Sequence, residues 1–370
     1  MRLRCFAPGG SNPEIWPTSK FDSLESAYRL GKGRSAQFDA GVRALALARR
    51  LAHNVDVAAF RMGCQHRLTS SRSLKILVLR GGALGDLLLT LPVLDAIRSK
   101  FPLSFIEVWG IRPQVDLLQS VDRIDRLDAL GIALLFVPGL TLPVLRRRLS
   151  EFDLAVSFLS DPDGVVAQNL ASAGVQRVIR GSPTMQPGMH AVYQLASVLE
   201  PLGLELYDPV PRLKIGREQM QKPLLGFHPG SGSQAKNWPL GHWYDFIEKI
   251  ASRFEGLLLI GGEADDEEIR AFQLRWRGPA FETAIRQNLW DLAHALTRCT
   301  IFVGHDTGVA HLAAAVRTPT VALFGPTDPD IWRPLGSHVK IVRGEDGRMD
   351  AISVRTVLDA VHALAVMQET

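Results

Sequence analysis

The sequence has little cysteine and no long hydrophobic run. Its three cysteines, Cys5, Cys64 and Cys299, are too few and too scattered for a disulfide framework or a zinc site, which suits a reducing compartment. The longest apolar stretch, at 131–145, is interrupted by two prolines and a glycine and lacks the roughly 18 uninterrupted residues that a spanning helix needs. No apolar core follows Met1, as a secretory signal would require. We therefore expect a cytoplasmic protein.

A large excess of one charge is also lacking, because the formal net charge is only +4. Residues 1–73 hold 12 Lys and Arg against 5 Asp and Glu, and the remaining residues hold 30 against 33. The basic surplus is confined to the N-terminal segment, which argues against nucleic acid as a partner. We interpret this segment, with helices at 23–31 and 40–54, as an accessory or poorly ordered extension. The alternative is that its basic helix at 40–54 lies on an anionic membrane surface.

What is present from Leu74 onward is a regular alternation of short apolar strands and helices. Fully apolar strands separated by helices predict parallel sheets covered on both faces. The predicted strands are 75–79, 104–110, 153–158, 177–180, 224–228, 256–262, 300–304 and 318–325. The predicted helices are 85–99, 112–119, 141–150, 162–173, 188–202, 239–252, 265–275, 288–298, 307–315 and 352–366.

A proline-rich, charged segment at 206–223 interrupts this alternation and indicates a boundary between two α/β units. We place the units at 74–215 and 222–345, after the extension 1–73, and expect a C-terminal helix within 351–370 to pack back on the first unit. Ligands of such sheets bind outside the carboxyl ends of the strands. Two units that face each other would form a cleft, and four loops with polar residues follow predicted strands.

The first loop, RGGALGD at 80–86, contains Gly81, Gly82, Gly85 and Asp86. It departs from the dinucleotide pattern G-x-G-x-x-G because Arg80 stands where the first glycine would be. Glu107 lies about 20 residues further on, where a ribose-binding acid could sit, so an NAD(P)-dependent oxidoreductase stays an alternative. An acid directly after the last glycine would repel a phosphate. Asp86 suits a helix N-terminus, where a carboxylate accepts hydrogen bonds from free amides.

The second loop, HPGSGSQAKNWP at 228–239, brings Ser231, Ser233 and Lys236 ahead of a predicted helix. Free amides, hydroxyl groups and one ammonium group are the materials for holding a phosphate. The spacing is not that of a P-loop, which needs G-x-x-x-x-G-K-[ST]. The alternative is an ordinary Gly/Ser loop with a solvated lysine.

Two further loops contain candidate ligand groups. In GGEADDEE at 261–268, Glu263 or Asp266 could bind a ribose hydroxyl, although acids also favour the first turn of a solvated helix. In HDTGVAH at 305–311, the helix start points free amides into the cleft, where they would stabilise a diphosphate. The residues concerned there are Asp306, Thr307, Gly308 and His311, with a buried core histidine as the alternative for the last.

Metal binding is not expected. The triplets at 161–163 and 328–330 have the D-x-D pattern with a central proline, which predicts helix or turn starts instead of a metal–diphosphate site. No His, Cys, Asp or Glu cluster in the sequence has convincing ligand spacing. We therefore expect no metal and no other cofactor.

Four segments together resemble, in order and spacing, the motifs of glycosyltransferase family 9, the ADP-heptose:lipopolysaccharide heptosyltransferases. These segments are ILVLRGGALGDLLLTLPVLDAIRSKFP, HPGSGSQAKNWPLGHW, LLLIGGEADDEE and GHDTGVAHLAAAVRTPTVALFGPTDPDIWRP. The similarity covers roughly residues 74–366, and residues 1–73 match nothing in that family. It implies a GT-B architecture, in which two Rossmann-like parallel-sheet domains face each other across a cleft. The first would bind the acceptor and the second the nucleotide sugar.

The resemblance also implies an activity, namely inverting transfer of heptose from ADP-heptose to a lipopolysaccharide core, with peripheral contact at the cytoplasmic face of the inner membrane. By that resemblance Asp86 is the general base, and Gly81, Gly82 and Gly85 form the acceptor loop. Ser231, Ser233 and Lys236 would hold the diphosphate, and Asp306, Thr307, Gly308 and His311 would surround the donor.

Several points stay open at this stage. They are which serine binds phosphate and whether Glu263 or Asp266 contacts the nucleotide. The alternative functions are a glycosyltransferase for another nucleotide sugar or glycan acceptor, the oxidoreductase above, and a non-catalytic nucleotide-sugar-binding protein.

Overall fold

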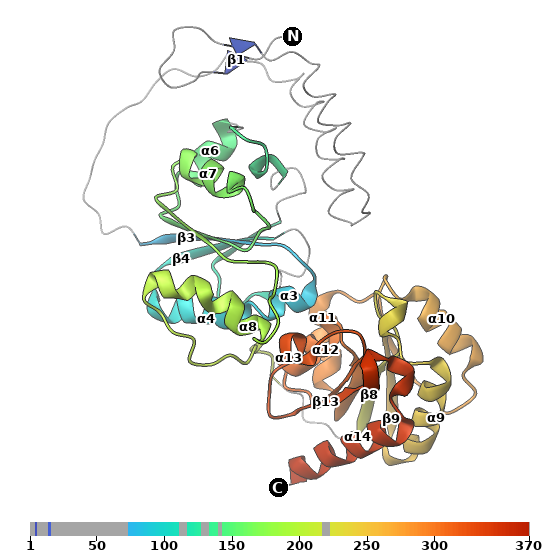
Figure 1. Cartoon of the computed structure of the whole chain (residues 1–370). Helices are drawn as coiled ribbons and strands as arrows, with labels where there is room; N and C mark the ends of the chain where they lie inside the picture. The colour runs from blue at the N-terminus through green and yellow to red at the C-terminus, as the bar shows by residue number, and fades with distance from the viewer. Residues whose placement is uncertain are drawn as a thin grey trace.

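The computed structural model describes residues 4–5, 14–15, 73–110, 117–126, 133–139, 143–216 and 223–369 (Figure 1). The predicted helices at 23–31 and 40–54, and most of the one at 112–119, lie outside the described residues. In the N-terminal extension, strands β1 (Arg4–Cys5) and β2 (Glu14–Ile15) pair antiparallel. The main body of the described chain forms two α/β units, each built on a parallel sheet.

The first sheet has the strand order β5-β4-β3-β6-β7, and all its described pairings are parallel. Its strands are β3 (Lys75–Arg80), β4 (Phe105–Gly110), β5 (Arg123–Arg126), β6 (Leu154–Ser157) and β7 (Arg177–Arg180). Its helices are α3 (Leu84–Leu88), α4 (Leu91–Lys100), α6 (Pro143–Leu149), α7 (Val165–Ser172) and α8 (Ala191–Leu195), which η2 (Ala196–Leu202) continues. Ile76 and Val78 share a core with α4 and α8, whereas Leu77 and Leu79 share one with α6 and α7 (Figure 1). The alternation along β3 therefore explains why both faces are covered.

The second sheet has the order β10-β9-β8-β11-β12-β13 and is parallel as well. Its strands are β8 (Leu224–His228), β9 (Gly256–Gly261), β10 (Glu282–Ile285), β11 (Ile301–His305), β12 (Thr320–Phe324) and β13 (Val339–Arg343). Its helices are α9 (Leu240–Ile250), α10 (Asp266–Arg275), α11 (Leu289–Thr297), α12 (Gly308–Ala315), α13 (Pro329–Trp332) and α14 (Val354–Glu369). Short 3₁₀ turns are η3 (Gln234–Lys236), η4 (Ala251–Arg253), η5 (Glu345–Gly347) and η6 (Met349–Ala351).

The central strands agree with the prediction, whereas three edge strands were missed. The missed strands β5, β10 and β13 each lie at the edge of a sheet. Their sequences, RIDR, ETAI and VKIVR, mix polar and apolar residues because one side of an edge strand faces solvent. The predicted helix 85–99 is two helices, α3 and α4, because Pro92 lies within the first two residues of the second and cannot continue an existing hydrogen-bond ladder.

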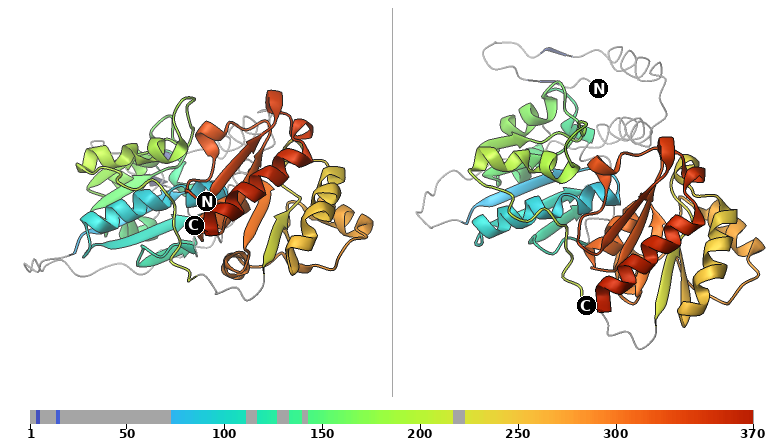
Figure 2. Two further views of the ribbon diagram at one scale, coloured as in Figure 1. Left: turned by 90° about the horizontal axis from the view of Figure 1, so that it is seen from below. Right: turned by 60° about the horizontal axis from the view of Figure 1, so that its bottom comes forward.

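The last helix lies elsewhere than expected. The sequence analysis expected it to pack back on the first unit, but α14 packs against α9, β12 and β13 of the second unit (Figure 2). Its buried residues Val357, Ala360, Val361 and Leu364 belong to the hydrophobic core of α9 and β8. The apolar stripe was recognised correctly, but the partner of such a stripe depends on the tertiary fold.

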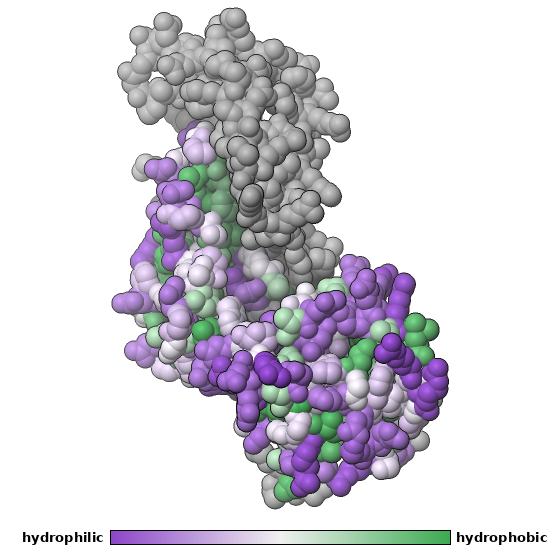
Figure 3. All heavy atoms as spheres, turned by 45° about the vertical axis from the view of Figure 1, so that its right-hand side comes forward, coloured by the Kyte–Doolittle hydropathy of each residue, from purple (hydrophilic) through white to green (hydrophobic). Residues whose placement is uncertain are grey.

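None of the helices in the described part of the chain has both the length and the hydrophobicity that crossing a membrane requires. The face of the second unit seen in Figure 3 is mostly hydrophilic, with scattered hydrophobic residues. Scattered residues of this kind are normal on a protein surface.

Candidate active site

The two units meet where α3 of the first packs against α12 of the second. A Cβ at Gly308 would lie 2.6 Å from Leu84 Cβ and 3.2 Å from the backbone nitrogen of Gly85. A Cβ at Gly85 would lie 3.2 Å from His311 Cδ2. Glycine on both helices thus permits their close approach. The first and fourth loops, which the sequence placed in different units, are brought together here.

Asp86 lies in the first turn of α3, as its helix-start interpretation predicted. Its Oδ2 accepts a hydrogen bond of 2.7 Å from Ala83 N. Gly82 has φ +97°, and a Cβ there would approach Asp86 Oδ2 to 2.6 Å. Glycine at position 82 therefore permits the positive φ of the turn and leaves room for the Asp86 carboxylate. The Asp86 side chain stays 26% exposed at the junction of the two units, and Oδ1 is its less engaged oxygen, 3.5 Å from Arg80 Nη2.

A buried arginine, which sequence analysis did not assign to the site, holds Asp86 from behind. Arg80 is 4% exposed, and its Nη2 donates to Asp86 O at 2.8 Å while its Nε donates to Thr90 Oγ1 at 2.9 Å. Thr90 Oγ1 in turn donates to Asp86 O at 2.8 Å. Burial lowers the pKa of the Arg80 guanidinium, and the charge of Asp86 opposes that shift. The only sequence signal was a charged residue at the end of an otherwise apolar strand.

Hydrogen bonds between residues of the second loop hold its turn in place. Ser231 is buried, and its Oγ lies 2.7 Å from Ser233 O and 2.6 Å from Asn237 Oδ1. Ser231 Oγ also accepts from Ser233 N at 3.2 Å. Ser233 itself is exposed. Ser231 therefore holds the turn together, whereas the Ser233 side chain is the one accessible to a ligand.

Lys236 connects the second loop to the fourth. Its Nζ donates to Asp306 Oδ2 at 2.8 Å, and the two side chains are 33% and 8% exposed. The alternative of a solvated lysine is therefore wrong, because this ammonium is fixed at the mouth of the site by a largely buried carboxylate. The ion pair places one positive and one negative charge beside the start of α12.

Thr307 and His311 lie at the same end of α12. The Thr307 hydroxyl is buried and has no hydrogen-bond partner within the described residues. His311 is 5% exposed, and its burial lowers its pKa to about 4 in spite of the nearby charge of Asp306. His311 is thus neutral near pH 7, and it faces α3 as well as its own unit. His311 is therefore a buried histidine, as the alternative interpretation held, and it also contacts α3 where the two units meet.

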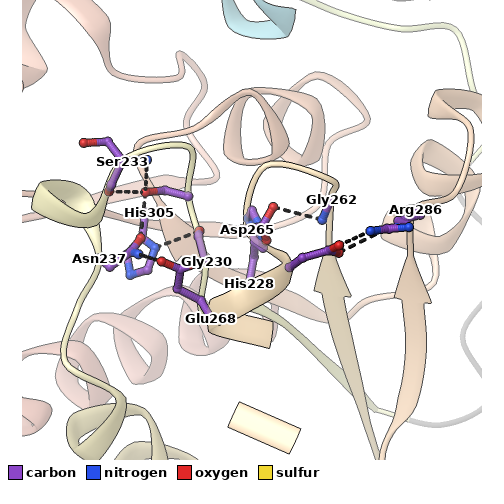
Figure 4. Close-up of polar contacts among 11 residues, drawn as sticks. His228, Gly230, Ser233, Asn237, Gly262, Asp265, Glu268, Arg286 and His305 are labelled. Carbon is purple, nitrogen blue, oxygen red and sulfur yellow. Dashed lines mark hydrogen bonds and ion pairs between the residues drawn. The ribbon is translucent and has the colours of Figure 1, made fainter. Parts of the chain in front are cut away.

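The third loop contains a further acid beside the two that were expected. Glu263 and Asp266 both line an open depression of about 390 Å³ beside Ser233, and Asp266 also forms an ion pair with Arg286. The buried acid is Asp265, which accepts from His228 Nε2 at 2.7 Å and from Gly262 N at 3.0 Å (Figure 4). Although burial opposes it, the hydrogen bond from His228 lowers the pKa of the Asp265 carboxyl. Sequence analysis missed Asp265, and nothing in the run of acids distinguishes it.

Comparison with known proteins finds a family and individual proteins to which this chain is similar. Residues 186–362 match the family model of glycosyltransferase family 9 (heptosyltransferase). The chain is 34% identical over 134 residues to lipooligosaccharide heptosyltransferase 2 of Haemophilus influenzae, covering 35% of this chain. It is 24% identical over 290 residues to lipopolysaccharide heptosyltransferase 3 of Escherichia coli, covering 69% of this chain and 83% of that protein. The chain is thus similar to glycosyltransferase family 9 through residues 186–362, a little under half of its length.

A comparison with solved structures shows the fold. The Escherichia coli ADP-heptose lps heptosyltransferase II structure superposes with a TM-score of 0.66 at 20% identity, covering 80% of this chain and all of that one. The architecture of the chain is therefore GT-B, as predicted. The alignments with its first curated relatives are shorter, and the match to the Haemophilus influenzae protein spans 39% of that relative's length.

Other polar groups that the sequence singles out have structural partners. Asp161 accepts from Val166 N and Ala167 N, and Asp328 accepts from Asp330 N, so both D-x-D triplets begin helices as predicted. Among the described residues, no group of three or more His, Cys, Asp or Glu side chains is arranged to hold a metal ion.

Glu107 was the residue on which a nicotinamide-nucleotide interpretation depended. It is buried in the middle of β4, accepts from Trp109 Nε1 at 2.7 Å and forms an ion pair with Arg148. Its carboxylate is therefore engaged within the first unit and does not stand at the carboxyl end of the sheet. Glu107 is therefore not placed to bind a ribose, and the dinucleotide-binding alternative is left without the acid on which it depended.

Proposed function

We propose that the protein is an inverting glycosyltransferase that transfers heptose from ADP-heptose to a lipopolysaccharide-core acceptor. The observation that carries this proposal is the α3–α12 contact, because it joins the carboxylate of Asp86 to the helix start that would bind the donor. The match to the family 9 model and the names of the relatives support the choice of donor and acceptor. The first unit would bind the acceptor and the second the nucleotide sugar.

The donor diphosphate would lie at the N-terminus of α12. Lys236 Nζ and the free amides of α12 supply positive charge there, and the unpartnered Thr307 hydroxyl offers a further hydrogen bond. Ser233 would bind from the second loop, and Glu263 faces the depression next to it. Asp306 would orient Lys236. When the ligand binds, the Lys236 ammonium would donate hydrogen bonds to the diphosphate as well as to Asp306. We propose that Lys236 and the α12 amides provide the positive charge that the diphosphate needs, and that no cofactor is bound.

Asp86 would act as the general base. Its Oδ1 takes the proton of the acceptor hydroxyl, whose oxygen forms a bond to the anomeric carbon as the bond from that carbon to the diphosphate breaks. Lys236 and the α12 amides stabilise the negative charge that develops on departing ADP. Arg80 and Thr90 hold the backbone of Asp86, so the carboxylate keeps its direction during this step. Attack from the side opposite the leaving group gives inversion.

A nucleotide-sugar panel tests the proposal. The purified protein is incubated with ADP-, UDP- and GDP-sugars, and binding and acceptor-dependent release of nucleotide are measured. We expect binding of ADP-heptose and release of ADP only with a lipopolysaccharide-core acceptor. Binding of UDP- or GDP-sugars alone would sink the heptose assignment, and ADP-heptose binding without transfer would favour a non-catalytic binding protein.

We further propose that the protein acts at the cytoplasmic face of the inner membrane, where a lipid-linked acceptor resides. The exposed side chains of Phe136, Arg146 and Arg147 in the first unit support this, because basic and aromatic groups favour an anionic membrane surface. Sedimentation with anionic vesicles should carry down the parent protein but less of an Arg146→Ser/Arg147→Ser variant. Equal sedimentation of both would contradict a role for these arginines.

A further inference from the structure

His305, the last residue of β11, is fully buried and bonds to both ends of the second loop. Its Nδ1 lies 3.0 Å from Gly230 O (Figure 4). Its Nε2 lies 2.9 Å from Trp238 N. A carbonyl accepts and a backbone amide donates, so Nδ1 carries the proton and Nε2 is the acceptor. One neutral tautomer thus satisfies both contacts. Burial lowers the pKa of His305 to about 3, so this tautomer persists at neutral pH.

The segment between these two contacts contains the residues assigned to the diphosphate. Ser233 and Lys236 lie between Gly230 and Trp238, and the bonds of Ser231 hold the turn from within. The ring of His305 packs edge-on against Trp243, with centroids 5.5 Å apart, which fixes its orientation. His305 therefore connects the backbone at both ends of this segment through one side chain.

Asp265 packs against the start of the same segment from another side. A Cβ at Gly230 would come within 2.5 Å of Asp265 Cβ and Oδ2, so Gly230 packs directly on Asp265. Asp265 is held in turn by His228 Nε2. Because of this packing, Gly230 has little freedom to move toward Asp265. Loss of its hydrogen bond to His305 would release it in the other direction.

We propose that His305 is a positioning residue that fixes the 230–238 segment so that Ser233 and Lys236 meet the donor diphosphate. This proposal rests on the proposed function, because it takes the diphosphate as the ligand. It extends that function to a residue that touches neither substrate. A displacement of about 1 Å at a site of this kind costs on the order of a hundredfold in rate, so a modest shift of the segment is measurable.

The test compares substitutions that differ in how many of the two contacts they keep. His305→Phe keeps a ring but neither hydrogen bond, His305→Asn can reach Gly230 O only, and His305→Gln carries both a donor and an acceptor. Thr318→Val is the matched control, because it removes another fully buried side-chain hydrogen bond, Thr318 Oγ1 to Leu296 O at 2.7 Å, elsewhere in the same unit. Affinity for ADP is measured by calorimetry, and exchange of the Trp238 amide by hydrogen–deuterium exchange without nucleotide.

We expect His305→Phe to weaken ADP binding by about tenfold or more and to speed exchange at the Trp238 amide. His305→Asn should lie between it and the parent, and His305→Gln should restore most of the affinity, while the KM for acceptor stays within about twofold. If His305→Phe does not fold, His305→Asn provides the same comparison. Thr318→Val should lower stability without changing ADP affinity.

The outcomes separate this proposal from the proposed function. Unchanged ADP affinity in His305→Phe and His305→Asn, or an equal loss in Thr318→Val, would overturn the positioning role. Failure of the parent protein to bind ADP would overturn the proposed function and with it the link from His305 to a diphosphate. In that case the exchange at Trp238 still reports whether His305 holds the segment.

Discussion

The imidazole of His311 lies directly against Gly85, with its Cδ2 3.2 Å from the point that a Cβ of Gly85 would occupy. The two residues belong to different units, so the contact between them sets how near the carboxylate of Asp86 comes to α12. The glycine that precedes the acid in GALGD therefore serves the junction of the units. The sequence had assigned Gly85 to the acceptor loop, and that role stays a proposal.

We predict that Gly85→Ala lowers kcat by about tenfold or more, because an added methyl group must displace His311 or separate α3 from α12. Stability should fall by about 1 kcal/mol or less, since the neighbouring ring can give by a few tenths of an ångström. Steady-state kinetics and urea unfolding measure the two effects. Gly241→Ala is the matched control, because it lies in α9 with no atom within 4 Å of an added Cβ. Equal activity of both variants would contradict the importance of the junction.

We predict that Asp86→Asn reduces kcat by roughly 10²–10⁴-fold, the range that a general base contributes. An asparagine can still accept the hydrogen bond from Ala83 N, so folding and ADP affinity should stay close to those of the parent. Single-turnover assays and calorimetry separate chemistry from binding. Normal turnover in this variant would refute the assigned base.

We predict that Lys236→Met weakens ADP binding by about 10–100-fold, which corresponds to about 1.4–2.7 kcal/mol. It should also destabilise the fold, because Asp306 is left largely buried without its partner. Lys236→Met/Asp306→Asn should recover stability but not ADP affinity. Lys249→Met removes the exposed pair with Asp245 on α9 and should change neither property appreciably. Recovery of ADP binding in the double variant would contradict the assignment of Lys236.

We predict that the free energy of unfolding falls as the pH drops from about 6.5 toward 4, in part because of two buried histidines. The folded-state pKa values are about 4 for His311 and about 3 for His305, against 6.5 for an ordinary histidine. In this window the unfolded chain binds the proton and the folded chain does not, so acid favours unfolding. Each histidine contributes a slope of up to about 1.4 kcal/mol per pH unit.

Non-titrating variants isolate that contribution. His305→Gln and His311→Gln should each reduce the pH dependence of the unfolding free energy between pH 4 and 6.5 by up to one proton. Urea unfolding at several pH values in this range gives the slopes. The carboxyl groups contribute equally to parent and variant, so they cancel in the difference. A slope identical to that of the parent would contradict neutral burial of the substituted histidine.

The central strands and the polar loops could be predicted because local sequence determines them. KILVL and LLGFH are apolar throughout, as buried parallel strands require, and each is followed by glycine and polar residues at the end where ligands bind. The starts of α7 and α13 were likewise predictable from an acid before a proline. These features depend on residues that are neighbours in the chain.

What could not be predicted depends on partners far apart in the sequence. Asp265 was missed between Glu263 and Asp266 because its role depends on His228, which precedes it by 37 residues. His305 looked like the end of a strand, since its contacts lie 67 and 75 residues away. The prediction that α14 packs back on the first unit was wrong for the same reason. An apolar stripe does not identify the surface that covers it.

The pairing of Lys236 with Asp306 has a consequence for which anions the site binds. An unpaired ammonium would draw any small anion from solution, whereas here the charge is already balanced by a carboxylate of the same unit. A simple ion such as inorganic phosphate gains little by displacing that carboxylate and should compete weakly. A larger ligand, whose sugar and nucleoside make contacts of their own, can displace it. Asp306 therefore lowers the affinity of the site for free phosphate in the cell and so contributes to its selectivity for the larger ligand.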